Sequence, residues 1–159
     1  MNSAAQWACR PSTLPTAAHG DALSASDDGV RILLADDDPQ VRAFTARVLT
    51  WTGWSVTAVC NGREAVDAWP VDGEAFNLVI LDDVMPEMNG FEAYRELSRR
   101  HPEALFLFVS AYAQGLNLDT FLHPGKTFFL AKPFMASTLV AVVRTALQAA
   151  RRDAPLLVG

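Results

Sequence analysis

Aspartates follow two short apolar segments in this chain of 159 residues. Asp36 and Asp37 come directly after residues 31–35 (RILLA), and Asp82 comes directly after residues 78–81 (LVIL). Both segments are too short for a buried helix, so we predict that they are buried strands of a parallel sheet. Ligands of such sheets bind at the carboxyl ends of the strands, and carboxylates there indicate a site for a cation and a phosphoryl group.

A hydroxyl group and an ammonium group follow two later apolar segments. Ser110 comes directly after residues 105–109, and Lys132 comes shortly after residues 127–130. We expect both side chains at the same edge of the sheet as the aspartates. Three carboxylates at one place repel each other unless a hard divalent cation neutralises them, and an all-oxygen site fits Mg²⁺ better than zinc. The lysine and the hydroxyl then complete an anion site.

The elements that position these residues alternate along the chain. A further strand is predicted over 54–59, and helices are predicted after Pro39, over 64–69, over about 91–100 and near the C-terminus. Between Ala111 and Gly125 the helical pattern weakens, so a helix there is short, over 118–122, or absent. Alternating strands and helices predict an α/β fold, doubly wound around a parallel sheet.

The composition of the sequence indicates how the chain is divided into domains and which classes of partner it disfavours. We predict a disordered tail over 1–29, one domain over 30–150 and a C-terminal tail over 151–159. The formal charge of −5 disfavours direct nucleic-acid binding. We find no signal peptide and no apolar run near eighteen residues, and therefore expect a cytoplasmic protein. Cys9 and Cys60 are expected to be isolated reduced thiols.

Five separated motifs, in this order, carry a resemblance to a known family. They are ADDDP from Ala35, LDDVMPEMNG from Leu81, VSAYA from Val109, the aromatic Phe129, and KPF from Lys132. From Arg31 to about Leu147 the sequence resembles a response-regulator receiver domain of two-component signalling. The resemblance implies a sheet of five strands in the order 2-1-3-4-5 and a cis Lys132-Pro133 peptide bond.

The resemblance also implies roles for the acidic residues. Asp82 would be the phosphoacceptor, although Asp83 beside it makes the assignment formally ambiguous; the spacing to Met85-Pro86 favours Asp82. Asp37 and Asp82 would bind Mg²⁺ directly with the backbone carbonyl of Val84, and Asp36 would act through a metal-bound water. Asp38 is interpreted as an acid in the first turn of a helix.

The remaining implied roles concern the phosphorylated state. Ser110 and Lys132 would hold phosphoryl oxygens, and Ser110 and Phe129 would form the switch that changes the surface of the domain. Phe128 is predicted to pack on the opposite face of the sheet. In the family the lifetime of the phosphorylated state depends on the positions of Val84 and Tyr112. Val84 cannot orient an attacking water. Tyr112 carries a hydroxyl, but its bulky ring could equally cover the phosphoryl group and exclude water, so we predict slow self-dephosphorylation.

The function that follows is a signalling module that receives a phosphoryl group from a histidine kinase or a histidine phosphotransfer protein. It would not be an enzyme, and it would act through protein contacts as a monomer or weak dimer. The sequence also resembles receivers of the kind appended to hybrid histidine kinases. One alternative is a haloacid-dehalogenase-like phosphatase, which requires Thr or Val after DxDx, where this chain has Pro39-Gln40. Another is a pseudo-receiver that binds partners without phosphorylation; the complete acid, hydroxyl and lysine set argues against it.

Overall fold

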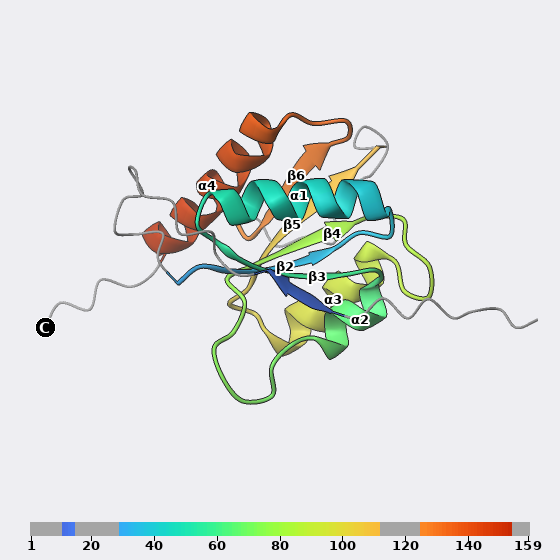
Figure 1. Ribbon diagram of the computed structural model, residues 1–159. Coiled ribbons are helices and arrows are strands. Elements are labelled where there is room, and N and C mark those ends of the chain that lie inside the picture. Colours follow the sequence, from blue (N-terminus) through green and yellow to red (C-terminus); the bar gives the residue numbers. More distant parts are fainter. Residues whose placement is uncertain (1–10, 15–28, 112–124, 154–159) are drawn as a thin grey trace, which may run out of the picture.

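The fold is a six-stranded sheet covered by helices on both faces (Figure 1). The computed structural model describes residues 11–14, 29–111 and 125–153. The strand order across the sheet is β1-β3-β2-β4-β5-β6. The strands are β1 (Ser12–Leu14), β2 (Arg31–Ala35), β3 (Ser55–Val59), β4 (Leu78–Asp82), β5 (Leu105–Ser110) and β6 (Thr127–Ala131).

Strands β2 to β6 are parallel, and their order matches the predicted 2-1-3-4-5 order when β1 is set aside. The predicted α/β, doubly wound fold is therefore confirmed. The peptide bond between Lys132 and Pro133 is cis, as the resemblance implies. The segment in which a short or absent helix is predicted, 118–122, lies outside the described residues.

Of the helices in the described part of the chain, two cover each face of the sheet (Figure 1). Helices α1 (Pro39–Trp51) and α4 (Ala136–Asp153) pack on the face that carries Ile32, Ile80 and Leu107. Helices α2 (Gly62–Asp67) and α3 (Gly90–Arg100) pack on the other face. Both layers are apolar because alternate residues of each buried strand point to opposite faces, and both faces are covered.

Polar side chains fix where three of the helices begin. The Asp38 carboxylate accepts hydrogen bonds from the backbone N–H groups of Gln40 and Val41 and caps α1. Asn61 caps α2, and Asn89 forms a reciprocal capping box with Glu92 at α3. These caps set the helix starts next to the strand ends that carry the polar residues. Asp38 thus precedes the first turn of α1 instead of lying within it.

Strand β1 lies inside the segment predicted to be a disordered tail, and for residues 12–14 that prediction is wrong. β1 pairs antiparallel with β3, with Ser12 opposite Ala58 and Leu14 opposite Val56. An edge strand needs only backbone hydrogen bonds, so it can form without the apolar pattern by which buried strands are recognised. Residues 1–10 and 15–28 of the tail lie outside the described part of the chain.

Cys60 corrects a second expectation. It is disulfide-bonded, and is therefore not the isolated thiol that the sequence predicts. Because β1 runs antiparallel to β3, Ser12 lies nearest the end of β3 that Cys60 follows. The other cysteine of the sequence, Cys9, lies outside the described residues.

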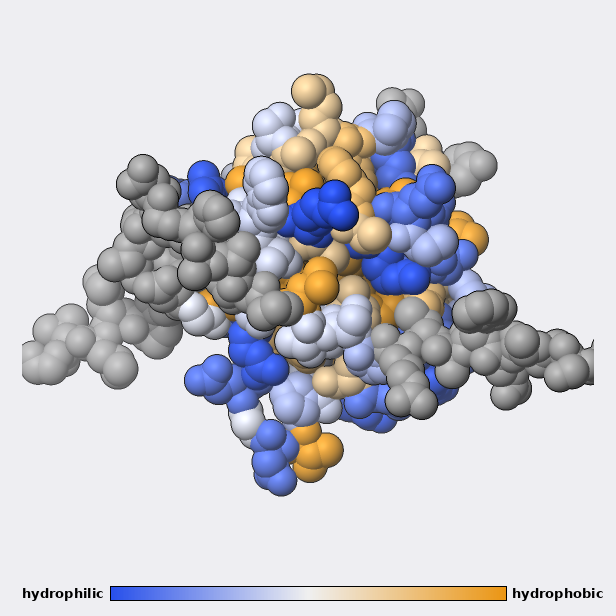
Figure 2. Space-filling view, in the orientation of Figure 1, coloured by the Kyte–Doolittle hydropathy of each residue, from blue (hydrophilic) through white to orange (hydrophobic). Residues whose placement is uncertain are grey.

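The outer surface of α1 is not uniformly polar. Phe44 is 44% exposed and Trp51 is 80% exposed. Figure 2 shows hydrophilic and hydrophobic residues side by side on this face of the molecule. Within the described ranges, no helix is both long and apolar enough to cross a membrane.

Candidate functional site

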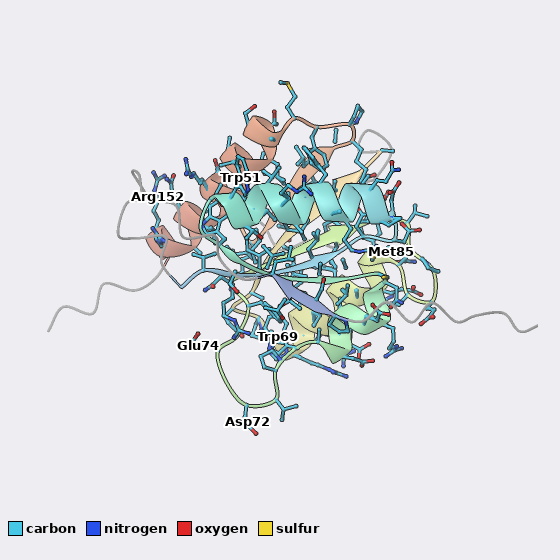
Figure 3. All side chains as sticks on the ribbon, viewed as in Figure 1. Trp51, Trp69, Asp72, Glu74, Met85 and Arg152 are labelled. Carbon is cyan, nitrogen blue, oxygen red and sulfur yellow. The ribbon has the colours of Figure 1, made fainter. Side chains whose placement is uncertain are left out.

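The predicted polar residues meet at the carboxyl ends of the parallel strands. Met85, in the loop that follows β4, is labelled at this end of the sheet in Figure 3. Asp36 follows β2, Asp82 ends β4, Ser110 ends β5, and Lys132 follows β6. The convergence follows from the topology, because every parallel strand of the sheet ends at the same edge.

Asp36 is buried and both of its carboxylate oxygens accept hydrogen bonds. Oδ1 accepts from the backbone N–H of Asp38 at 2.9 Å, and Oδ2 accepts from Nζ of Lys132 at 3.0 Å. Arg42 of α1 donates to the backbone carbonyl of Asp36 at 2.6 Å. These bonds fix the carboxylate against the start of α1. By contrast, Asp37 is exposed and faces solvent beside it.

Asp82 is buried at the end of β4, with 6% of its surface exposed. The loop that follows β4 folds back against the end of the strand, where the N–H of Gly90 donates to the backbone carbonyl of Asp83 at 3.3 Å. A Cβ atom at Gly90 would collide with the backbone carbonyl oxygen of Asp82. Glycine at this position therefore allows α3 to start against the strand end that carries the aspartate.

Lys132 connects the two buried carboxylates. Its Nζ lies 3.0 Å from Oδ2 of Asp36 and 3.2 Å from Oδ2 of Asp82. The chain is held there by the backbone N–H of Lys132, which donates to the carbonyl of Ser110 at 2.8 Å. A cavity of about 410 Å³ opens beside the lysine and is lined mainly by α1 and by residues next to the lysine; its lining comprises Gln40, Val41, Phe44, Ala111, Lys132, Pro133 and Phe134.

Three carboxylates, those of Asp36, Asp37 and Asp82, could together hold a metal ion, and we call them the acidic group. Asp36, Asp37 and Asp82 each offer one oxygen, and these oxygens all lie within 4.8 Å of one another. The donor set consists of oxygen alone, which suits a hard cation such as Mg²⁺ better than zinc. The residues present therefore fit the predicted cation.

Burial and mutual repulsion alter the protonation of the site. Burial, followed by the charge of Asp36, raises the pKa of Asp82 to about 7, and the ammonium of Lys132 only partly opposes this. Burial also raises the pKa of Asp36 above its ordinary value, against the stabilising hydrogen bond from Lys132. Burial by itself would lower the pKa of Lys132, but Asp36 and Asp82 together raise it. A bound cation would favour the ionised carboxylates.

The Ser110 hydroxyl lies at this edge, as predicted, but one of its contacts was not predicted. Its Oγ donates a hydrogen bond to Oδ2 of Asp83 at 2.6 Å. From the sequence, Asp83 is expected only as a competitor of Asp82 for the role of phosphoacceptor. Its position was available from the sequence, because it directly follows Asp82 and the neighbouring strand ends in Ser110.

Phe129 and Phe128 lie on opposite faces of the sheet, which confirms the predicted alternation. Phe128 packs against the core under α1 and α4, and Phe129 packs against the core under α2 and α3. The ring of Phe129 stacks on Phe108 of β5, with centroids 5.5 Å apart and planes inclined by 12°. Phe108 in turn stacks on Phe91 of α3 at 4.7 Å. Phe129, Phe108 and Phe91 thus form a row of stacked rings across β6, β5 and α3.

Val84 and Tyr112 are the two positions expected to set the lifetime of a phosphorylated state. Val84 lies two residues after Asp82, and 65% of its surface is exposed. Its side chain is therefore free of the core and stands at the rim of the site. Tyr112 lies outside the described residues.

Comparison with protein families matches residues 32–144 to the response regulator receiver domain. Response regulator receiver protein CpdR of Brucella abortus is 36% identical over 121 residues, covering 76% of this chain and 98% of that protein. Sensor kinase CckA of the same organism is 35% identical over 117 residues, which are 74% of this chain but 12% of the kinase. The chain therefore spans only a small part of that relative's length.

Solved structures agree with these sequence matches. The crystal structure of a response regulator receiver protein from Sinorhizobium medicae superposes with a TM-score of 0.68 at 27% identity, covering 77% of this chain and 98% of that one. The crystal structure of the receiver domain from hybrid histidine kinase CckA gives a TM-score of 0.62 at 29% identity, with 74% and 99% covered.

Proposed function

The chain belongs to the response regulator receiver domain family, and on this premise we propose that Asp82 is the residue that accepts the phosphoryl group. Receiver domains are the phosphoacceptor modules of two-component signalling, and a histidine kinase or a histidine phosphotransfer protein supplies the phosphoryl group. The observation that carries the assignment is the position of Asp82. It lies 3.2 Å from the ammonium of Lys132 and within 4.8 Å of the other two carboxylates of the acidic group.

In the proposed reaction, a carboxylate oxygen of Asp82 attacks phosphorus in line with the leaving group. A bond forms between this oxygen and phosphorus, the bond between phosphorus and the donor imidazole nitrogen breaks, and the nitrogen keeps the electron pair. Lys132 neutralises charge on the equatorial phosphoryl oxygens without changing its own bonding. It can do so because its Nζ already lies beside Asp82.

We propose that Asp37 and Asp82, with the backbone carbonyl of Val84, hold Mg²⁺, and that Asp36 acts through a water molecule on the metal. Asp37 is exposed and available, whereas both oxygens of Asp36 already accept hydrogen bonds. The cation would supply positive charge that lowers the repulsion between the carboxylates and the incoming phosphoryl oxygens.

The proposed output is a change of surface, transmitted by Ser110 and Phe129. Ser110 would donate to a phosphoryl oxygen on Asp82, and Phe129 would change its packing against Phe108. We propose that the module has no enzymatic activity beyond its own phosphorylation and dephosphorylation. We also propose that it acts through protein contacts as a monomer or weak dimer. The domain is proposed over residues 30–150, although α4 continues to Asp153, into the predicted C-terminal tail, and β1 adds an edge strand from the predicted N-terminal tail.

A phosphatase of the haloacid-dehalogenase type is not favoured by the site. In that reading Asp36 would be the nucleophile and Asp38 its acid partner, but the Asp38 carboxylate is occupied with capping α1. The family match also excludes this reading. A pseudo-receiver, which does not use phosphorylation, is the remaining alternative.

The test is incubation of the full chain with acetyl phosphate and Mg²⁺, followed by intact-mass measurement. We expect one added phosphoryl group per chain, and none when Mg²⁺ is removed with a chelator. Failure to label in the presence of Mg²⁺ would contradict the proposed function and would favour the pseudo-receiver.

A further inference from the structure

The hydroxyl of Ser110 is engaged by a carboxylate that is not part of the acidic group. The distance from Ser110 Oγ to Asp83 Oδ2 is 2.6 Å, within the range of short hydrogen bonds from a hydroxyl to a carboxylate. Ser110 is almost completely buried, with 1% of its surface exposed. This contact is therefore shielded from bulk water on the serine side.

The strand register explains why these two residues meet. Asp82 of β4 pairs with Val109 of β5. The residues that follow them, Asp83 and Ser110, therefore also lie opposite each other. Gly90 donates its N–H to the carbonyl of Asp83 and so fixes the backbone at this point. The acceptor is thus held in place by the loop that also positions Asp82.

We propose that Asp83 is a positioning residue that retains the Ser110 hydroxyl in the resting domain and must release it before Ser110 can bind a phosphoryl oxygen on Asp82. This inference rests on the proposed function. It assigns to Asp83 a role in the switch, distinct from those of the phosphoacceptor and of the metal-binding carboxylates.

The proposed role of Asp83 follows because a hydroxyl group can donate only one hydrogen bond at a time. Ser110 carries a single O–H, so a bond donated to Asp83 competes with a bond donated to a phosphoryl oxygen. Both acceptors are charged, and bonds to charged acceptors are stronger than neutral ones. The side chains of Asp82 and Asp83 also lie close enough to interact. A phosphoryl group on Asp82 would add negative charge near Asp83. The repulsion would favour movement of the Asp83 carboxylate away from Ser110.

The first experiment measures binding of beryllofluoride, a mimic of the phosphoryl group, to the full chain in Mg²⁺. Asp83→Ala should tighten binding by about tenfold, the effect expected when one charge-assisted hydrogen bond no longer competes. Asp83→Asn keeps an acceptor oxygen while removing the charge, and should tighten binding less. Asp38→Asn is the matched control, since it removes a charge near this edge but keeps a residue that caps α1.

The same measurement in a Ser110→Ala background separates the contact from a general effect of charge. If Asp83 acts through Ser110, most of the gain from Asp83→Ala disappears in that background. An equal gain with and without the serine hydroxyl would overturn the proposal. If wild type fails to bind beryllofluoride, the proposed function fails instead.

A second measurement decides the inference without phosphoryl chemistry. In metal-free protein, the unfolding equilibria of Asp83→Ala, Ser110→Ala and the double variant form a double-mutant cycle. We expect a coupling of about tenfold in the equilibrium constant, the size of a hydrogen bond to a charged group. Additive effects of the two substitutions would show that Asp83 does not hold Ser110, whatever the result with beryllofluoride.

Discussion

The Nζ atom of Lys132 lies 3.2 Å from Oδ2 of Asp82, although the two residues come from strand ends that are separated by β5. The lysine reaches across Ser110, whose carbonyl accepts the backbone N–H of Lys132. The pairing places a positive charge beside a buried acid that would otherwise be surrounded by negative charge.

Lys132→Ala should slow phosphorylation by acetyl phosphate by about a hundredfold, the typical cost of removing one group that stabilises developing charge. The measurement is the initial rate of labelling in saturating Mg²⁺. Lys126→Ala is the matched control, because Lys126 precedes β6 and donates to the carbonyl of Pro102, away from the acidic group. Equal rates in the two variants would contradict the role given to Lys132.

The metal-free domain should lose stability as pH rises. The pKa of Asp82 is raised from 3.8 to about 7 in the folded state, so between these values the folded chain binds more protons than the unfolded chain. The stabilisation is complete below pH 3.8 and is lost as the pH passes through about 7. Urea unfolding at several pH values in a chelator measures the slope.

Asp82→Asn provides the control for this pH dependence, because it removes one of the two carboxyl groups whose pKa is raised in the folded state, the other being Asp36. The variant should flatten the slope between pH 4 and pH 7 in the same buffers. Adding Mg²⁺ to wild type should also restore stability near neutral pH, since the cation binds the ionised carboxylates. A slope that is unchanged in Asp82→Asn would show that other groups cause it.

Adjacent aspartates should differ in their effect on metal binding. Asp37→Ala should weaken Mg²⁺ binding much more than Asp38→Ala, because the Asp38 carboxylate caps α1 and is not part of the acidic group. Asp38→Ala should instead cost about 1 kcal/mol of stability, the usual effect of losing an N-cap. Calorimetric titration with Mg²⁺ and thermal unfolding measure the two effects, and equal losses of affinity would refute this distinction.

Much of this arrangement follows from the sequence because buried parallel strands are continuous apolar runs. The polar residues that interrupt such runs, Asp36, Asp82 and Ser110, mark the strand ends and hence the edge of the sheet. Strand β1 was missed because Ser12–Leu14 is exposed and has no apolar periodicity. The bond between Ser110 and Asp83 was missed because strand alternation does not determine where a side chain points just beyond the end of a strand.

The position of Val84 leads to a prediction about the lifetime of the phosphorylated state. Its exposed aliphatic side chain cannot hydrogen-bond an attacking water, so wild type should dephosphorylate slowly. Val84→Asn should speed the decay by up to about tenfold, which is less than a fully positioned general base contributes. Loss of label is followed after the phosphodonor is removed, with Tyr112→Ala as the second variant. Unchanged or slower decay in both variants would refute the prediction.

Asp82, and not its neighbour Asp83, is proposed to accept the phosphoryl group. The most direct measurement is the extent of labelling by acetyl phosphate in Mg²⁺ for wild type, Asp82→Asn and Asp83→Asn, with the modified peptide identified by mass spectrometry. Asp82 lies beside Lys132 and belongs to the acidic group, whereas Asp83 accepts a hydrogen bond from Ser110. We predict that Asp82→Asn abolishes labelling and that Asp83→Asn retains it. Full labelling of Asp82→Asn together with loss of label in Asp83→Asn would show that Asp83 is the phosphoacceptor.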